Sequence, residues 1–499
     1  MTRILSVFKL LKRVGFAVLL LGTAYGQPPD TLWTRVIFQD RISVLTTGWL
    51  ENSGQVVLAG LAADTIRPEG GPYDFALGTI NTAGDLLSYH RYNDQSSGQL
   101  GQFGNSCPDT DGNVLLAGLG GLGIACLKIN STGDTIWSRS YFTLATSVRG
   151  VVCCDTSGFL ICGARSGAGE NLLDGYIMKI SPNGDSLWHR QFSGGFGTSE
   201  EIWDVVSDRN GFVFSMSGET NNAQDPDTTF TDIIRIDSVG NIVERWQYRF
   251  TSYTIVRDIS IGSGGHIYGA GYVRNQSFQG DRRLLFCVDN VGTVRWSKIG
   301  MEEQFSSDYI QVESAYDYGG CTVLGNVTYS LDGRALLESY SSDGDTNWTA
   351  SYLPSFLDIG DNAVFTNMVK LEDGRYLLNG LCSKIIPESR YGTGLILTEA
   401  DPLSSIEPFS PLPQSLYLSA FPNPFNPTTT LSFSLPQSSL VELSVYDALG
   451  RVIMTRGMGM LHAGAHEIAI DGAEWSSGVY FARVSAGRME KVVKMALLR

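Results

Sequence analysis

A repeat of about fifty residues is the feature of this 499-residue sequence that most restricts its fold. A turn glycine is followed four places later by tryptophan at Gly133–Trp137, Gly184–Trp188, Gly292–Trp296 and Gly344–Trp348. Degenerate copies lie at Gly84–Ser88 and Gly240–Trp246. Measured from the last residue of one copy (Ser88 in the first, tryptophan in the others) to the last residue of the next, the intervals are 49, 51, 58, 50 and 52 residues. Repeats of this length are typical of solenoids and propellers, in which each unit buries its apolar face against its neighbours.

Within each unit, short apolar runs and turns follow one another in the same order. In the fourth unit, the apolar run Trp203–Val206 precedes a turn, and Phe212–Gly218 follows as a second run. After a polar loop come the alternating segment Asp232–Ile236, a second turn and the tryptophan-bearing strand. Turn residues every 8–12 positions indicate an all-β chain, and four strands per unit match one propeller blade.

Seven copies of the second strand predict the number of blades. They are Gly54–Gly60, Gly112–Gly118, Gly158–Gly163, Gly211–Gly218, Gly265–Gly271, Gly320–Gly325 and Gly374–Gly380. The last unit continues to a third strand at Leu395–Thr398, but no tryptophan strand follows it; Asp30–Phe38 supplies such a strand at the other end of the chain. We therefore expect residues 27–403 to form a seven-bladed β-propeller closed by the N-terminal strand, which leaves no open sheet edge.

The Gly-x-x-x-Trp spacing resembles the tryptophan-docking repeats of quinoprotein-like propellers. The rest of the unit resembles propeller repeats that are common in secreted bacterial proteins with sorting tails. The resemblance implies that each indole packs between adjacent blades. Trp137, Trp188, Trp296 and Trp348 are accordingly expected in the core and not as residues that stack on a ligand.

The first 26 residues have the features of a signal peptide. A basic stretch ends at Lys12–Arg13, a short apolar run covers Val14–Gly22, and small residues precede a cleavage point between Gly26 and Gln27. The apolar run is shorter than the roughly 20 residues that span a bilayer. We expect an exported mature chain without a transmembrane segment.

The eight cysteines lie in or beside apolar runs and are expected mainly as buried small hydrophobic residues, although an exported chain can form disulfides.

A different pattern begins after the Pro- and Ser-rich segment 404–415, which we interpret as a linker. Residues 416–499 contain Phe421–Pro427, with its Pro-Asn-Pro sequence, and the motifs Asp447-Ala-Leu-Gly-Arg451 and Ser477-Gly-Val-Tyr480. Apolar residues alternate at Val441, Leu443 and Val445 and recur at Val479, Phe481 and Val484, as in half-buried strands. About seven strands fit, which predicts a small Ig-like β-sandwich.

This C-terminal module resembles the type A sorting domain of the type IX secretion system, which shares its fold with an Ig-like domain of a flagellar hook-capping protein. The resemblance implies export across both membranes, recognition of the tail by the type IX secretion machinery, and release or attachment to the outer cell surface. The basic residues Lys491, Lys494 and Arg499 match the family pattern, and they either contribute to the sorting signal or solvate an edge strand.

Charge and motif spacing exclude several kinds of function. The formal net charge is −15, and the basic signal segment contributes none of the acids, which argues against nucleic-acid and anionic-membrane partners. His462 and His466 lie in a Gly- and Ala-containing segment with no helix to align the two rings, so no metal site is expected. We predict no catalytic residues and no cofactor, and we expect a monomer.

The long connections between strands are the expected ligand-binding rim, because loops on a rigid scaffold commonly carry function. They are Leu61–Asp74, Ala164–Asp174, Ser193–Glu201, Glu219–Thr231 and Tyr272–Asp281. Their candidate residues, with two from the loop after Gly300, are Tyr73, Phe196, Glu200, Glu201, Asp225, Asp227, Phe278, Glu302 and Glu303. This pattern favours a non-catalytic surface protein that binds glycans or proteins. The alternatives are an extracellular polysaccharide hydrolase or lyase and a structural surface-layer component.

Overall fold

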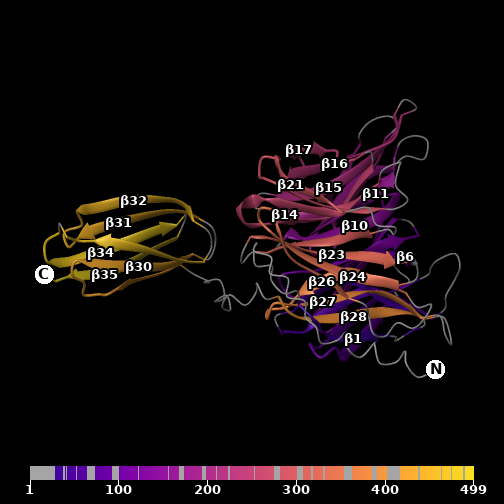
Figure 1. Ribbon diagram of the computed structural model, residues 1–499, viewed down its shortest axis with the longest axis horizontal. Coiled ribbons are helices and arrows are strands. Elements are labelled where there is room, and N and C mark those ends of the chain that lie inside the picture. Colours follow the sequence, from indigo (N-terminus) through magenta and orange to yellow (C-terminus); the bar gives the residue numbers. More distant parts are fainter. Residues whose placement is uncertain are drawn as a thin grey trace, which may run out of the picture. The chain divides into compact units, whose positions relative to one another are not determined.

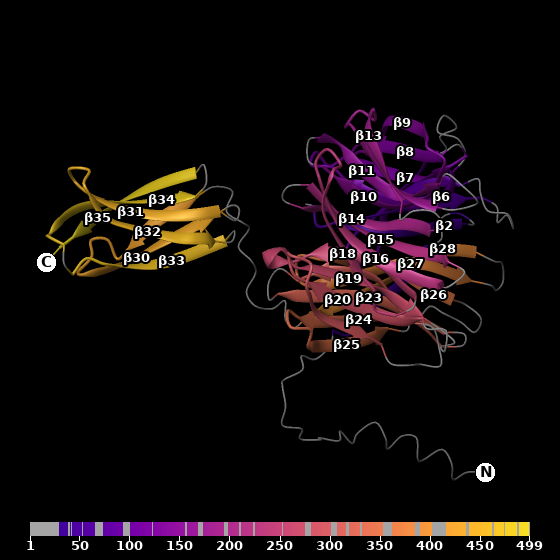
Figure 2. The ribbon, with the colours of Figure 1, turned by 90° about the horizontal axis from the view of Figure 1, so that it is seen from above.

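The structure is a computed structural model, and it divides into two compact units, Met1–Ser405 and Ile406–Arg499 (Figures 1 and 2). It describes residues 29–498 apart from 38–39, 41, 52, 65–72, 93–99, 122, 155–156, 168–172, 194–197, 209–210, 223–224, 252, 275–280, 301–306, 316–318, 330–331, 353–361, 385–389, 402–415, 436–438, 462–463, 474 and 487–488. Gly26, Gln27, the predicted signal peptide and the predicted linker therefore lie outside the described residues.

The first unit consists mainly of strands, with a 3₁₀ turn at Ser263–Gly265. The first three repeats are β2(Ile42–Leu50), β3(Val56–Ala63), β4(Asp74–Ile80), β5(Leu86–Tyr92); β6(Leu100–Pro108), β7(Val114–Gly120), β8(Gly123–Ile129), β9(Thr135–Phe142); and β10(Ala145–Cys153), β11(Phe159–Ser166), β12(Leu173–Ile180), β13(Ser186–Phe192). The next three are β14(Thr198–Asp208), β15(Gly211–Asn222), β16(Asp225–Asp237), β17(Ile242–Tyr248); β18(Tyr253–Ile261), β19(Ile267–Arg274), β20(Arg282–Val288), β21(Val294–Ile299); and β22(Ser307–Ser314), β23(Gly320–Tyr329), β24(Asp332–Ser341), β25(Thr346–Tyr352). The last repeat contains β26(Asn362–Lys370), β27(Arg375–Lys384) and β28(Arg390–Ala400).

These repeats form a β-propeller-like, all-β fold. Five of the sheets in this unit contain four consecutive strands each, and one contains eight. The larger sheet joins β2–β5 to the group β26–β28 through a parallel pair, Ile42 and Tyr391. The N-terminal strand β1(Thr31–Ile37) pairs antiparallel with β28, from Thr31 opposite Thr398 to Ile37 opposite Thr393. This is the pairing that the sequence predicts for the surplus strand.

The first strand of every repeat has a β-bulge opposite the second strand. The register shifts occur at Leu45/Thr47, Phe103/Asn105, Val148/Gly150, Ile202/Asp204, Val256/Asp258, Tyr309/Gln311 and Phe365/Asn367. A glycine near the end of the second strand makes room for the bulge: a Cβ on Gly163 would lie 2.3 Å from the carbonyl oxygen of Ser147. Close backbone approach thus explains the glycine that ends the second apolar run in six of the seven repeats, whereas at Gly218 the Phe230 ring occupies the space of a Cβ.

Hydrogen bonds join the first strands of neighbouring repeats, and we call these seven strands the first-strand ring. Six junctions are Thr47–Ser106, Asn105–Arg149, Ser207–Cys153, Asp204–Ile259, Asp258–Val312 and Gln311–Met368. The seventh is a hydrogen bond of 2.9 Å from the Thr366 hydroxyl to the Thr46 carbonyl, which connects the last repeat to the first. The ring of contacts is therefore continuous within the described residues.

The indoles dock on the turn glycine of the next repeat, which explains the Gly-x-x-x-Trp spacing. Gly184 has φ 84°, and a Cβ there would meet the Trp137 ring at 3.2 Å. The Trp137 indole N–H donates to the Pro182 carbonyl at 3.0 Å. Gly240, Gly292 and Gly344 stand in the same relation to Trp188, Trp246 and Trp296. In these four repeats the same glycine adopts a left-handed turn conformation and leaves room for the indole of the preceding repeat, and glycine satisfies both demands.

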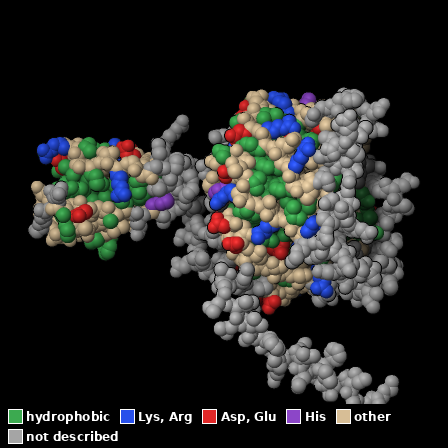
Figure 3. Space-filling view, turned by 45° about the horizontal axis from the view of Figure 1, so that its top comes forward, with side chains coloured by type: hydrophobic (Ala, Val, Ile, Leu, Met, Phe, Trp, Pro, Cys, Tyr) green, Lys and Arg blue, Asp and Glu red, His purple; other side chains and the backbone are tan. Residues whose placement is uncertain are grey.

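The expected core positions of the tryptophans are confirmed in two cases and modified in two. Trp137 and Trp348 are buried, whereas Trp188 and Trp296 are half-buried and pack against the cores of neighbouring repeats. None of the eight cysteines, all of which are described, forms a disulfide; six of them are buried as expected, and Cys107 and Cys153 are half-buried. On the face seen in Figure 3, apolar side chains of this unit lie among charged ones.

The second unit consists of two antiparallel sheets around one core. β29(Tyr417–Phe421), β30(Thr428–Leu435) and β33(Gly464–Asp471) form one sheet. β31(Ser439–Asp447), β32(Val452–Leu461), β34(Gly478–Ala486) and β35(Met489–Leu497) form the other. The expected alternation is confirmed at Val441, Leu443 and Val445. In β34, however, Val479 and Phe481 are half-buried, and the buried residues are Tyr480, Ala482, Val484 and Ala486. The prediction for β34 was wrong because it skipped from position 481 to 484, which breaks the two-residue period of a strand.

The Pro-Asn-Pro segment holds the last strand in place. The Asn423 amide donates to the Lys494 carbonyl at 2.7 Å and accepts from the Ala496 N–H at 2.9 Å. Phe425 is 2% exposed and exchanges backbone hydrogen bonds with Ala496 and Leu498. The motif that is most distinctive in the sequence thus pairs with the C-terminal strand. Within the described part of the chain, no helix has the length and apolar character to cross a membrane.

Candidate binding site

The structure describes only part of the predicted rim. Phe196, Phe278, Glu302 and Glu303 lie outside the described residues. Asp225 and Asp227 lie in β16, at its start, and Arg499 is again outside the described part of the chain. Lys491 and Lys494 lie in β35 with exposed side chains, an arrangement compatible with either interpretation of these residues.

Neither Tyr73 nor Glu200, both predicted rim residues, is exposed in the structure. Tyr73 is half-buried, packs against two hydrophobic clusters and donates its backbone N–H to the Leu100 carbonyl at 2.8 Å. Glu200 is 1% exposed. The reason is that β14 begins at Thr198, inside the segment expected to be a loop, and the strand alternation places Glu200 on the same face as the buried Ile202.

Glu201 is engaged by the preceding repeat. The Arg149 guanidinium lies 2.8 Å from its carboxylate, and the Ser147 hydroxyl donates to the same oxygen. Arg149 also lies over the Trp203 ring at 4.4 Å. This carboxylate connects two members of the first-strand ring, and its charge is compensated there.

A second pair of acids lies in the same ring. Asp204 and Asp258 are hydrogen-bonded to each other, and each also accepts a backbone N–H, from Ile259 and Val312 respectively. Burial raises the pKa of Asp204 to about 6, and burial together with the neighbouring Asp204 charge raises that of Asp258. The described residues contain no group of three acids, histidines or cysteines placed to hold a metal ion.

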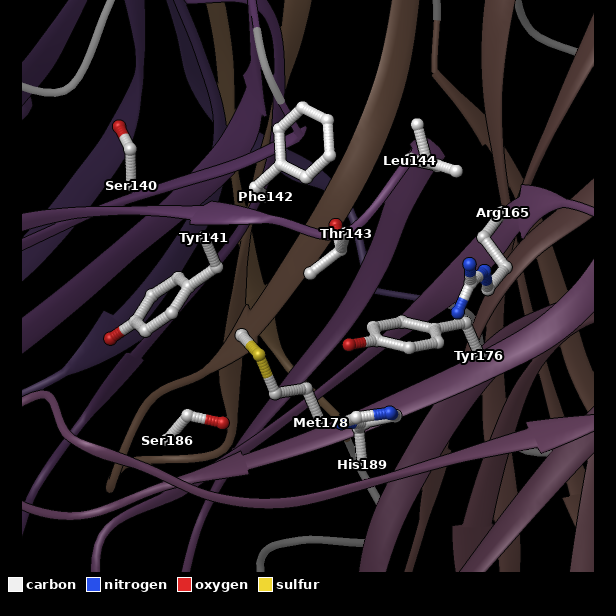
Figure 4. A pocket seen from close by; sticks show the side chains of 10 residues that line it. All are labelled: Ser140, Tyr141, Phe142, Thr143, Leu144, Arg165, Tyr176, Met178, Ser186 and His189. Atoms are coloured by element: carbon white, nitrogen blue, oxygen red, sulfur yellow. The ribbon is translucent and has the colours of Figure 1, made fainter.

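An open cavity of about 500 Å³ lies between the second and third repeats (Figure 4). Its lining residues come from β9, the β9–β10 connection, β11, β12 and β13: Ser140, Tyr141, Phe142, Thr143, Leu144, Arg165, Tyr176, Met178, Ser186 and His189. None of these lining residues is acidic. In Figure 4, Arg165, Tyr176 and His189 lie on one side of the cavity, and Tyr141 and Ser186 lie on the other.

The mouth of this cavity has an unusual backbone conformation. Leu144 has φ 54°, the only positive φ of a residue other than glycine in the described chain, and its side chain is 51% exposed. Its carbonyl accepts a hydrogen bond of 3.0 Å from the Ser166 N–H, and the Thr143 hydroxyl accepts one from Ala145. Phe142 beside it is 73% exposed. A strained backbone and an exposed aromatic ring at a cavity mouth are features of functional sites.

Arg165 is the one charged side chain in the lining apart from any charge on His189. Its guanidinium lies over the Tyr176 ring at 5.7 Å, and its buried Nε has no hydrogen-bond partner within the described residues. Asp174, opposite Arg165 in the β11–β12 pair, is instead hydrogen-bonded by Gln191. The Tyr176 and His189 rings are 5.9 Å apart. An arginine that has no carboxylate partner within the described residues, beside aromatic rings and hydroxyls, is chemically suited to an anionic ligand.

Sequence reasoning missed these residues, with one partial exception. Arg165 falls within the connection Ala164–Asp174, which was expected to be on the rim, but it was not a candidate. Tyr176 and His189 lie in strands that read as core, so no local signal distinguishes them. The cavity is formed where β9 of the second repeat meets β12 and β13 of the third, and this contact cannot be inferred from either repeat alone.

The comparisons with known proteins identify the C-terminal unit. The family model of the secretion system C-terminal sorting domain matches residues 419–497. This domain marks the protein for export by type IX secretion, to the cell surface or the medium, as the sequence predicts. No curated protein matches the chain.

Among solved structures, the chain is similar to PorZ, a surface component of the type IX secretion system of Porphyromonas gingivalis, with 12% identity and a TM-score of 0.38. The match covers 91% of this chain but only 59% of PorZ. It is also similar to a copper-containing fungal alcohol oxidase, with 11% identity, a TM-score of 0.44 and coverage of 95% and 100% of the two chains. A Trypanosoma rangeli sialidase in complex with sialic acid shows 11% identity, a TM-score of 0.38 and coverage of 92% and 88%.

Proposed function

We propose that this exported protein is a non-catalytic glycan-binding protein of the cell surface, with an adhesive or capturing role. In this proposal, the large unit is a seven-bladed β-propeller and the second unit an Ig-like sandwich that carries the sorting signal. Two features support the blade count. β1 supplies a fourth strand to β26–β28, and hydrogen bonds join the first strands of seven repeats in a closed series.

The observation that carries the binding role is the cavity between β9, β12 and β13. Its volume of about 500 Å³ lies within the roughly 300–1,000 Å³ of small-ligand sites. It combines aromatic rings with the hydroxyls of Ser140, Thr143 and Ser186, the groups by which a sugar is usually stacked and hydrogen-bonded. Glycans therefore suit it better than an extended protein surface does.

A polysaccharide hydrolase remains the alternative, and the geometry favours it less. A glycosidase requires two carboxyl groups about 5–10 Å apart with access to the substrate. Asp204 and Asp258 instead contact each other and accept backbone N–H groups of the next repeat. Their hydrogen bonds support a structural role in the first-strand ring.

Two experiments test the proposal. The first deletes residues 416–499 and follows the location of the large unit by cell fractionation. We expect it to accumulate in the periplasm, with a deletion limited to 404–415 as the control for shortening the chain. Normal surface display without the tail would contradict the sorting role.

The second experiment passes the purified exported protein over a broad glycan array. Retention of at least one glycan without cleavage supports the binding role. Release of shortened products would favour the hydrolase, and the absence of any bound glycan would contradict the proposal.

A further inference from the structure

We infer that the cavity between the second and third repeats binds an acidic sugar residue and that Arg165 recognises its carboxylate. This inference rests on the proposed glycan-binding function and specifies the ligand class. It starts from the charge of the lining, since a chain of net charge −15 has there a cavity with a cation and no acid. A neutral sugar would leave the Arg165 guanidinium without a counter-charge from the described part of the chain.

Most of the other arginines that lie over aromatic rings in this unit are neutralised by a carboxylate; Arg190, over Trp188, instead donates to the carbonyls of His189 and Val239. Arg257 lies over Tyr272 and is 2.7 Å from Asp308. Arg274 lies over Tyr253 and is 2.7 Å from Asp281. Arg165 has the ring but no ion-pair partner among the described residues, and the ligand would supply the missing carboxylate.

The geometry of arginine indicates a planar anion. A guanidinium presents parallel N–H groups that match the two oxygens of a carboxylate. The Tyr176 ring lies under the guanidinium of Arg165, and Tyr176 is 3% exposed. This buried ring therefore fixes the orientation of the guanidinium plane. One arginine favours a single negative charge per sugar residue, as in a uronic acid, over a doubly charged phosphate.

The remaining lining residues fit the rest of a sugar. Ser140, Thr143 and Ser186 offer hydroxyl groups, and His189 offers a ring nitrogen. Phe142 and Leu144 form an apolar edge that is exposed at the mouth. A sugar has both an apolar ring face and hydroxyls at its edge, so this combination is complementary to it.

The test uses the full exported chain and an array with three classes of glycans: uronic-acid glycans, sulfated glycans and neutral glycans. For each uronic-acid glycan, the methyl ester provides a ligand of the same shape without the charge. We expect the wild-type protein to retain uronic-acid glycans and to bind their esters and the neutral glycans at least about tenfold more weakly, the usual size of a hydrogen bond to a charged group.

The matched variants are Arg165→Gln and Arg139→Gln. Arg139 lies on β9 outside the cavity lining, is exposed, and donates to the Ser138 carbonyl at 3.1 Å. Arg165→Gln should weaken binding about 10- to 100-fold and Arg139→Gln should leave it unchanged, while Arg165→Lys should fall between them because it keeps the charge and loses the fork.

Several outcomes overturn the inference. Preferential retention of neutral or esterified glycans would do so without harming the proposed function. Preference for sulfated over uronic-acid glycans would show that the recognised group is a sulfate and not a carboxylate. Equal binding by the two glutamine variants would show that the ligand does not bind at Arg165. If no glycan is retained by the wild-type protein, both the inference and the proposed function fail.

Discussion

The first-strand ring and the cavity between the second and third repeats use the same pair of groups, an arginine over an aromatic ring, in different ways. In the ring, Arg149 and Arg257 also meet the carboxylates of Glu201 and Asp308 at 2.8 and 2.7 Å. In the cavity, Arg165 has no such partner within the described residues. The two regions therefore differ in charge compensation and not in residue type, and the uncompensated cation is what makes the cavity a candidate binding site.

Removal of a compensating charge from the first-strand ring should have the largest effect on the free energy of unfolding. Glu201→Gln leaves Arg149 without its carboxylate at a position where Glu201 is only 16% exposed, so the free energy of unfolding of the large unit should fall by about 1–3 kcal/mol. Urea denaturation measures this. Glu372→Gln, at an exposed turn, is the control and should change stability by less than about 0.5 kcal/mol. If Glu201→Gln kept its stability and lost ligand binding, Glu201 would be a rim residue after all.

The hydrogen-bonded acids of the ring predict a dependence of stability on pH. Burial raises the pKa of Asp204 from 3.8 to about 6 and raises that of Asp258 as well. An acid with a raised pKa in the folded state binds its proton more tightly there, so its stabilising contribution is complete below the unfolded pKa and is lost as the pH rises through the folded pKa. We expect the unfolding free energy to fall between about pH 4 and pH 7.

The variant Asp258→Asn isolates this contribution. It removes one titrating group and keeps an oxygen that can accept the Val312 N–H, so stability should decline less between pH 4 and 7, by on the order of 1 kcal/mol. Thermal unfolding of both proteins over this pH range measures the difference. Parallel curves for the two proteins would show that the pKa of Asp258 is not raised in the folded state.

A smaller effect is expected at the mouth of the cavity. Leu144→Gly relieves the positive φ at an exposed position and should raise the unfolding free energy by about 0.5–1 kcal/mol. Leu187→Gly is a suitable control, because Leu187 is similarly exposed but lies in the regular strand β13, where glycine should be destabilising by a similar amount. A loss of stability in both variants would argue against backbone strain at Leu144.

The smallest effect on stability is expected at the residue that matters most for the comparison. Arg165→Gln removes no ion pair within the described structure, so the unfolding free energy should change by less than about 0.5 kcal/mol. The contrast with Glu201→Gln in the same urea denaturation series is the informative quantity. A loss as large as that of Glu201→Gln would mean that Arg165 is compensated and structural, like Arg149.

Most of the strand order was predictable because its signals are local. The turn glycines, the two-residue alternation and the missing strand after Leu395–Thr398 led to the β1–β28 pairing that the structure contains. The rim was predicted less well. Glu200 was assigned to a loop because a polar Thr-Ser-Glu-Glu sequence reads as solvated, whereas β14 begins within it and the alternation buries Glu200.

The repeat, the pairing of the N-terminal strand and the sorting domain could all be inferred from the amino-acid sequence, because they follow from turn chemistry and periodicity over a few residues. Which charges meet could be seen only once the chain was folded. Arg149 and Glu201 are 52 residues apart, and the cavity of Arg165 takes its walls from two repeats. Electrostatic pairing depends on distances of a few ångströms between strands that lie a whole repeat apart, and no local pattern in the sequence records those distances.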